Sequence, residues 1–221
     1  MSFSEFKNPP ESSVDAELWK LAIATDEFEG YAHPHASRIA IIADEVAQLF
    51  NLAPHDRFSL RQAALVHDLG EAVMNRDYIK RSSVLTEEER LDLMRHPVIG
   101  EQEAAKKGLD RAVQLTVRWH QEWWNGEGYP DGLRREQIPL TARILRVVDA
   151  YAALTDHRPH SPAVSVEDAR LHLKQWAGLE FDPKVVWAFL SLPAIDELQS
   201  FSDLLPFSSE NQRLIEENGG W

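Results

Sequence analysis

The chain of 221 residues contains no cysteine, and this absence excludes disulfide bonds, thiolate nucleophiles and zinc or iron–sulfur sites with cysteine ligands. It also lacks any run of about 20 apolar residues that could span a bilayer, and its first ten residues lack the charged-then-apolar pattern of a signal peptide. We therefore expect a cytoplasmic protein with no membrane partner. Hydrophobic residues make up 43% of the chain, which argues against disorder and allows a sizeable buried core.

Positive charge is scarce, because 23 Lys and Arg residues stand against 36 Asp and Glu residues. The resulting net charge of −13 opposes binding to long nucleic acids. A small anionic substrate is compatible with this charge, because bound cations reverse the local sign of the field. Nine histidines are present, and without cysteine any transition-metal site must use His, Asp and Glu ligands, which suit iron, manganese or zinc.

Helical spacing dominates the hydrophobic pattern. Ile39, Ile42 and Val46 recur at helical intervals, and no segment shows the sustained two-residue alternation of a strand. The sequence therefore predicts an all-α fold, a single compact helical bundle. Residues 122–140 interrupt it with an irregular loop rich in Gly, Pro and aromatic residues. We expect residues 1–30 to form an N-terminal extension and first helix, residues 31–202 the domain, and residues 203–221 a C-terminal tail.

Several ionisable residues lie in apolar surroundings. Asp149 lies in the apolar segment 144–148, where a carboxylate costs several kcal/mol unless a metal ion or an arginine compensates its charge. The pair His67-Asp68 closes an apolar run, and a single pair of this kind is typical of a histidine hydrogen-bonded near a helix end. Further histidines at comparable positions are His35, His96 and His120.

Five ordered motifs between about His35 and Leu190 resemble the HD-GYP family, a branch of the HD metal-dependent phosphohydrolases. The matching segments are AALVHDLG, LTEEERLDLMRHPVIG, WHQEWWNGEGYPDGL, IPLTARILRVVDAYAALT and FDPKVVWAFL. The resemblance implies a metal centre inside a helical bundle of HD-domain type. It also implies that the irregular loop is the GYP loop, which lies beside the substrate pocket.

The resemblance also assigns roles to individual positions. The first metal corresponds to His35, His67, Asp68 and Asp149, with Asp68 as the bridging ligand, and the second metal to His96 and His120. Substrate contacts correspond to the GYP-loop residues Gly126, Gly128, Tyr129 and Pro130 and to the basic residue Arg158. Such a centre hydrolyses phosphodiesters through a metal-bound water, since two cations roughly 3.5–4 Å apart activate water and stabilise in-line displacement. We therefore expect a phosphodiesterase acting on cyclic di-GMP or a related cyclic dinucleotide, with Asp68 and His120 as catalytic residues.

The chain departs from the family pattern at several positions. Gln121 replaces a second histidine, and its amide oxygen is a poorer ligand than imidazole. Glu71 replaces a lysine, so that it either ligates metal itself or repels substrate, and Ala152 replaces a second aspartate. Tyr31 stands where three-metal members carry an acidic ligand, and His160 and Ser161 stand where a tyrosine and a basic residue are usual. We therefore expect one firmly bound divalent metal (Fe, Mn or Zn) and a second that is weak or absent.

Two alternatives follow from these departures. In the first alternative, the chain is a catalytically impaired signalling module that binds a signalling-protein partner through the GYP loop. In the other it is a mononuclear phosphohydrolase that acts on another nucleotide or a different small phosphate ester.

Overall fold

The helices follow the hydrophobic pattern of the sequence along the whole described chain. The computed structural model describes residues 13–31, 33–81, 83–157 and 162–192. Its α-helices are α1 (Ser13–Glu29), α2 (His35–Leu49), α3 (Pro54–Leu65), α4 (Leu69–Met74), α5 (Glu87–Leu93), α6 (His96–Lys106), α7 (Arg111–Trp119), α8 (Leu140–Thr155), α9 (Val166–Trp176) and α10 (Pro183–Leu190). Two short 3-10 helices are η2 (Asp77–Lys80) and η3 (Arg135–Gln137). Within the described ranges there is no strand, only one isolated bridge between Ala177 and Phe181, so the expected all-α fold is confirmed.

Several helices begin at residues whose side chains satisfy free backbone N–H groups. The Thr86 hydroxyl accepts from the Glu89 N–H at 3.2 Å, and the Glu89 carboxylate accepts from the Thr86 N–H at 2.9 Å, which forms the capping box of α5. Ser165 caps α9 and Asp182 caps α10 in the same manner.

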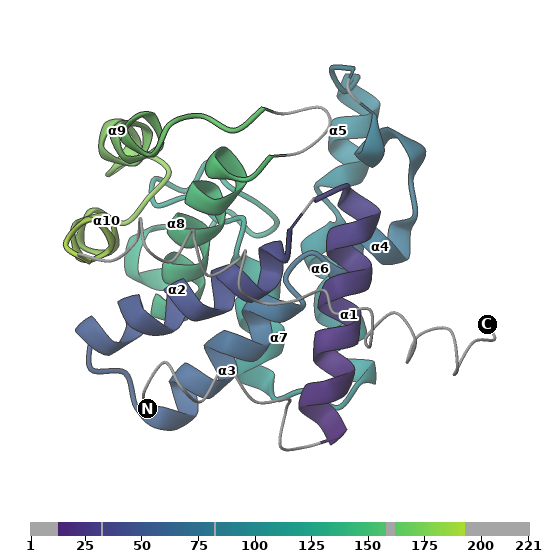
Figure 1. Cartoon of the computed structure of the whole chain (residues 1–221), viewed down its shortest axis with the longest axis horizontal. Coiled ribbons are helices and arrows are strands. Elements are labelled where there is room, and N and C mark those ends of the chain that lie inside the picture. Colours follow the sequence, from purple (N-terminus) through teal and green to yellow (C-terminus); the bar gives the residue numbers. More distant parts are fainter. Residues whose placement is uncertain (1–12, 32, 82, 158–161, 193–221) are drawn as a thin grey trace.

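The core lies between the central helices. Ile39, Ile42 and Val46 of α2 are buried against α3 and α8, and each such side chain contributes about 1.5–3 kcal/mol by leaving water. Figure 1 shows α1, α4, α5 and α6 on the right of the molecule, α8, α9 and α10 at the upper left, and α2, α3 and α7 below these three. Among the described residues no helix is long and apolar enough to cross a membrane.

A close approach between α4 and α6 depends on Gly70. A Cβ atom at this position would lie 2.0 Å from the main-chain oxygen of His96, so that only glycine allows the two helices to pack at this distance. The contact fixes the turn that precedes α4 against the first residue of α6. Two segments with candidate ligands are thereby held side by side.

Candidate metal centre

Helix ends and one helix interior bring the six expected ligands together. His35 is the first residue of α2 and His96 the first of α6, whereas His120 follows α7 directly. The pair His67-Asp68 forms the turn between α3 and α4, and α8 supplies one aspartate from its interior. All four imidazoles are buried to within 2% of full burial, as the burial pattern of the sequence predicted.

Three of these residues form a group that we name site A, which consists of His35, His67 and Asp149. The Oδ1 atom of Asp149 lies 3.6 Å from Nε2 of His35 and 3.7 Å from Nε2 of His67. Arg146 approaches the same carboxylate from the other side, with Nη1 3.6 Å from Oδ2. The buried carboxylate therefore faces two imidazoles and one arginine.

The other three residues form site B, which consists of Asp68, His96 and His120. The two Nε2 atoms lie 3.3 Å apart, and Oδ1 of Asp68 lies 3.3 Å from that of His96 and 3.4 Å from that of His120. The other oxygen of Asp68, Oδ2, lies 3.1 Å from Nε2 of His67 in site A. Asp68 thus stands between the two sites, with one oxygen turned to each.

Hydrogen bonds fix the tautomer of every one of these histidines. Nδ1 of His67 bonds the carbonyl of Ala64 at 2.9 Å, and the corresponding bonds of His96 and His120 go to the carbonyls of Leu93 and Val117. His35 differs, because its Nδ1 bonds the carboxylate of Asp156 at 2.7 Å. Carbonyl and carboxylate oxygens only accept hydrogen bonds, so each Nδ1 carries a proton and Nε2 is the nitrogen that faces the centre.

This arrangement fits divalent cations. Nε2 of His35, Nε2 of His67 and Oδ1 of Asp68 are buried without a hydrogen-bond partner, which is costly unless a cation or proton satisfies them. The Nε2 lone pairs of His96 and His120 face each other and repel unless a cation or proton lies between them. Their separation of 3.3 Å is close to that of two nitrogen ligands about 2.0–2.1 Å from one tetrahedral ion. Donor type, burial and spacing therefore agree with metal binding.

Burial and neighbouring charges shift the pKa values of the groups in the centre in different directions. Burial opposes the charge on Asp68, but His67, His120 and His96 outweigh it and hold the pKa of this carboxyl well below its usual range. Burial likewise opposes protonation of His67, yet Asp68 and Asp149 raise its pKa well above the ordinary value. Burial lowers the pKa of His96 to about 4. Asp68 is therefore ionised at neutral pH, and His96 is neutral and able to bind a cation.

Residues at the family departures make contacts of their own. The amide oxygen of Gln121 accepts from Nη1 of Arg146 at 2.8 Å, and Arg146 also pairs with Glu180. The Glu71 carboxylate lies 3.7 Å from Nδ1 of His96, the ring nitrogen turned away from site B. The ring of Tyr31 stacks on that of His35, with centroids 3.8 Å apart.

Two acidic residues of α1 were missed by the sequence reasoning. The Asp26 carboxylate accepts from the N–H of Ala36 at 3.2 Å, and burial raises its pKa to about 6 against the opposing charge of His35. Glu29 is buried, and burial together with the negative charges of Asp68 and Glu71 raises its pKa well above the usual value. No motif signals either residue, because α1 precedes the segments that resemble the family.

The GYP loop is folded around a buried carboxylate. Glu122 accepts hydrogen bonds from the N–H groups of Asp131, Gly132 and Leu133 at 2.6, 3.0 and 2.9 Å. Gly128 packs against the chain at Trp123, where a Cβ atom would lie 2.2 Å from the main-chain nitrogen. These contacts hold the loop in one conformation without regular secondary structure.

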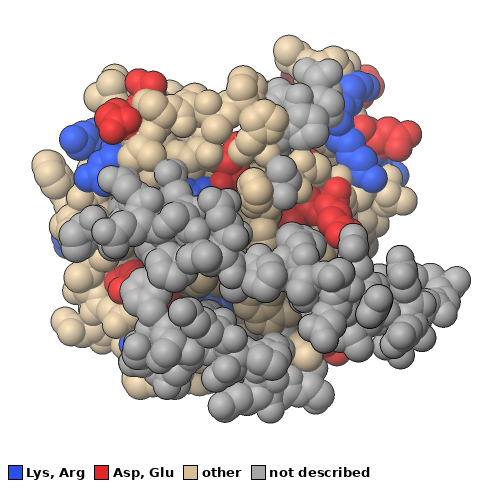
Figure 2. All heavy atoms as spheres, viewed as in Figure 1, with Lys and Arg blue, Asp and Glu red and all other residues tan. Residues whose placement is uncertain are grey.

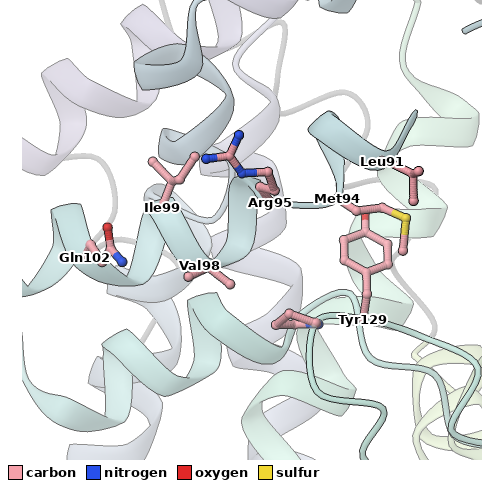
Figure 3. Close-up of a pocket in the computed structure, with 8 residues that line it drawn as sticks. Leu91, Met94, Arg95, Val98, Ile99, Gln102 and Tyr129 are labelled. Atoms are coloured by element: carbon pink, nitrogen blue, oxygen red, sulfur yellow. The ribbon is translucent and has the colours of Figure 1, made fainter. Parts of the chain in front are cut away.

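Tyr129 of this loop, which a cis peptide bond joins to Pro130, lies next to site B. Its ring contacts that of His96 edge-on, with centroids 6.1 Å apart. Tyr129 and Pro130 also line a cavity of about 340 Å³ against α5 and α6, and Figure 3 shows the tyrosine ring directed towards Met94 and Leu91. Of the other expected substrate contacts, Gly126 and Gly128 lie in the same loop, whereas Arg158, like His160 and Ser161, lies outside the described residues.

Comparisons with known proteins identify the family of the chain. The model of the HD domain family matches residues 23–185. Over 176 residues the chain is 34% identical to the cyclic di-GMP phosphodiesterase response regulator RpfG of Xanthomonas campestris pv. campestris. This alignment covers 78% of this chain and 46% of that protein. Over 165 residues the chain is 28% identical to a cyclic di-GMP phosphodiesterase of Thermotoga maritima. That alignment covers 72% of this chain and 44% of the relative.

A solved structure extends the likeness to three dimensions. The crystal structure of a cyclic GMP-AMP-specific phosphodiesterase from Vibrio cholerae matches with a TM-score of 0.64 at 19% identity, over 86% of this chain and 54% of that one. This likeness concerns the fold alone. The chain spans less than half the length of the two curated relatives described above. The family match, the ordered motifs and the helical fold show that this chain belongs to the HD domain family and is of the HD-GYP type.

Proposed function

We propose that this chain is a metal-dependent phosphodiesterase that hydrolyses cyclic di-GMP or a related cyclic dinucleotide. The observation that carries the proposal is the position of Asp68, whose two oxygens face site A and site B at 3.1–3.4 Å. The names of the curated relatives and of the V. cholerae structure support the substrate class. Residues 31–202 would form the catalytic domain, between the extension 1–30 and the tail 203–221.

The ligand sets proposed for the two metals are those of the resemblance. His35, His67, Asp68 and Asp149 would hold one divalent cation, and His96 and His120, with Asp68 between, a second and weaker one. A metal bound there would act as a Lewis acid that polarises a phosphoryl oxygen and lowers the pKa of water. Fe, Mn and Zn all suit these nitrogen and oxygen donors.

The protein side chains would orient the substrate and handle its protons. Hydrolysis adds water to phosphorus, breaks one P–O bond and delivers a proton to the leaving oxygen. Nε2 of His120 is a candidate to take up a proton from the attacking water and pass it to the leaving oxygen when only site A is filled, because Nδ1 is bonded to Val117 and Nε2 faces the centre. Tyr129 and Pro130, with Gly126 and Gly128, would hold the nucleotide beside site B, since the adjoining cavity has one aromatic wall.

The surface charge supports a small ligand rather than a long nucleic acid. On the face shown in Figure 2, the described basic side chains lie scattered beside acidic ones and form no continuous basic surface. Long nucleic acids require such a surface, because phosphate neutralisation supplies most of their non-specific affinity.

The proposal is tested by incubating purified protein with cyclic di-GMP in the presence of Mn²⁺ or Fe²⁺. We expect linear dinucleotide or GMP, and loss of activity by at least about 10³-fold in Asp68→Ala, which removes the carboxylate shared by both sites. Retention of more than a tenth of the activity in that variant would show that the centre lies elsewhere. No product with either metal, together with undetectable dinucleotide binding, would reject the proposed substrate.

A second candidate function rests on the contact between Gln121 and Arg146. Since the Gln121 amide oxygen is bonded to this arginine at 2.8 Å, site B gains no evident ligand from the position at which the family has a histidine. The chain would then be an impaired module that binds nucleotide or a signalling protein through the GYP loop. Elemental analysis giving at most one metal per chain, with binding but no turnover, would favour this function over hydrolysis.

A further inference from the structure

His35 is oriented differently from the other three histidines of the centre. His67, His96 and His120 each bond the main-chain carbonyl three residues earlier, which is within reach because each follows a helix or its last turn. His35 is the first residue of α2, and the preceding helix, α1, ends six residues earlier at Glu29. The partner of its Nδ1 is the carboxylate of Asp156, which lies 121 positions later in the chain, at 2.7 Å.

Asp156 immediately follows α8, the helix that also carries Asp149. This one helix therefore supplies a carboxylate to each side of the same imidazole, at 2.7 Å from Nδ1 and 3.6 Å from Nε2. Because a carboxylate accepts but does not donate, Asp156 keeps the proton on Nδ1. The Nε2 lone pair of His35 is left directed at site A, where it has no hydrogen-bond partner.

Arg38 holds the second oxygen of this carboxylate. Its Nη1 donates to Oδ1 of Asp156, and its Nη2 donates to the hydroxyl of Thr155 at 2.9 Å. The guanidinium is 6% exposed and lies over the ring of Tyr151, with its carbon 5.7 Å from the centroid. Both oxygens of Asp156 are thus bound by residues of α2, His35 and Arg38, which lie one turn apart.

We infer that Asp156 is a positioning residue for metal binding at site A, which acts by fixing the tautomer and ring orientation of His35. The inference rests on the proposed metal role of site A and goes beyond it, since it assigns a function to a residue outside the ligand set. Partners of this kind make a metal-binding histidine more basic, and their loss lowers metal affinity by about 10–100-fold. Arg38 contributes to this role, because its hydrogen bond to Oδ1 of Asp156 keeps that carboxylate from turning away from His35.

The experiment compares Asp156→Ala with the matched control Asp44→Ala. Asp44 is likewise a carboxylate that binds arginine: it lies on α2, is 5% exposed and accepts hydrogen bonds from Arg57 and Arg61 of α3. It touches none of the six proposed ligands, so its loss reproduces the structural cost alone. The readouts are the ring ¹⁵N resonances of the histidines in metal-free protein, at a pH where the imidazoles are neutral, and the Mn²⁺ affinity by titration calorimetry.

We expect Asp156→Ala to move His35 from the Nδ1–H form towards the Nε2–H form and to weaken Mn²⁺ binding by about 10–100-fold. His67, His96 and His120 should keep their tautomers, and Asp44→Ala should change neither readout. An unchanged His35 tautomer with Mn²⁺ affinity within twofold of the wild type would overturn the inference, as would an equal loss of affinity in the control.

A second variant decides the matter if Asp156→Ala does not fold. Asp156→Asn keeps the shape and one acceptor oxygen but removes the charge, so it should weaken Mn²⁺ binding by a smaller factor and still change the His35 resonances. Wild-type values for both readouts in a folded Asn variant would reject the inference. Neither measurement uses cyclic di-GMP, so the inference and the proposed hydrolysis can fail independently.

Discussion

Among the individual residues, Gln121 shows how a structural contact changes the meaning of a substitution. The resemblance treats it as a poor ligand in place of histidine. Its amide oxygen instead accepts from Arg146 at 2.8 Å, and the arginine bonds Glu180 with its other terminal nitrogen. An amide held in this way helps to orient the guanidinium beside Asp149 and has no need of a metal.

We therefore predict that Gln121→Ala leaves the metal content of the protein unchanged. The variant loses one hydrogen bond to a charged group, which costs about 1.5–3 kcal/mol, and it should unfold at a lower temperature. His120→Ala, one position earlier, should lose metal from site B. Elemental analysis of both variants checks the prediction, and a fall in metal content in Gln121→Ala would identify the amide as a ligand after all.

The protonation of His67 leads to a second prediction, which concerns the pH dependence of metal affinity. Its pKa is raised well above 6.5 in the metal-free protein, because Asp68 and Asp149 outweigh its burial, so Nε2 holds a proton at neutral pH. A cation must displace that proton, and metal affinity should therefore rise as the pH rises from neutral towards the raised pKa. His96, with a pKa of about 4, is already neutral and adds nothing to this rise.

Calorimetry of Mn²⁺ binding near neutral pH, in buffers of different ionisation enthalpy, measures the protons released. We expect about one proton from His67, with a further fraction from His35, whose pKa is also raised because Asp149 and Asp156 outweigh its burial. A binding enthalpy that does not depend on the buffer would contradict the prediction.

For the secondary-structure elements, local signals in the sequence were sufficient where they involve neighbouring residues. The capping box at Thr86 and the caps at Ser165 and Asp182 join residues within three positions of each other, so the residue types there are enough to indicate where these helices begin. The helices α4 and η2 are too short for a hydrophobic period to show in the sequence. The bond between His35 and Asp156 was not predictable, since its partners are 121 positions apart and no local pattern connects them.

The GYP loop is the element whose conformation depends most on one side chain. Glu122 is 2% exposed and its two oxygens accept three main-chain N–H groups between residues 131 and 133. Composition predicted an irregular loop, but only the fold shows that the loop is wrapped around this carboxylate.

Glu122→Gln should therefore loosen the loop. The amide nitrogen cannot accept, so at least one of the three main-chain N–H groups loses its partner, at a cost of about 1 kcal/mol. Hydrogen exchange at residues 131–133 should accelerate, and the thermal midpoint should fall. Glu127→Gln is the matched control, because Glu127 is an exposed residue of the same loop that bonds Asn125. Equal effects of the two substitutions would show that the buried carboxylate does not hold the loop.

On the scale of the whole molecule, the centre is a product of topology. Its six residues lie between positions 35 and 149 and come from α2, the α3–α4 turn, α6, the end of α7 and α8. The sequence identified all six as candidates through ordered motifs, but spacing alone carries no distances. The packing of α4 on α6 at Gly70, and of α8 on α2, brings the donors within 4.8 Å of one another in each site.

A metal bound at this junction should stabilise the entire fold, because the ligands converge only in the folded chain. Mn²⁺ at about 100 times its dissociation constant should add about 2.7 kcal/mol to the free energy of unfolding, and EDTA should remove this gain. Thermal unfolding followed by circular dichroism, over a series of Mn²⁺ concentrations, measures the effect. In Asp68→Ala the two sites lose their shared carboxylate, so most of the concentration dependence should disappear. An equal rise in the midpoint of wild type and variant would place the stabilising metal elsewhere on this acidic protein, since a centre that depends on Asp68 cannot act equally without it.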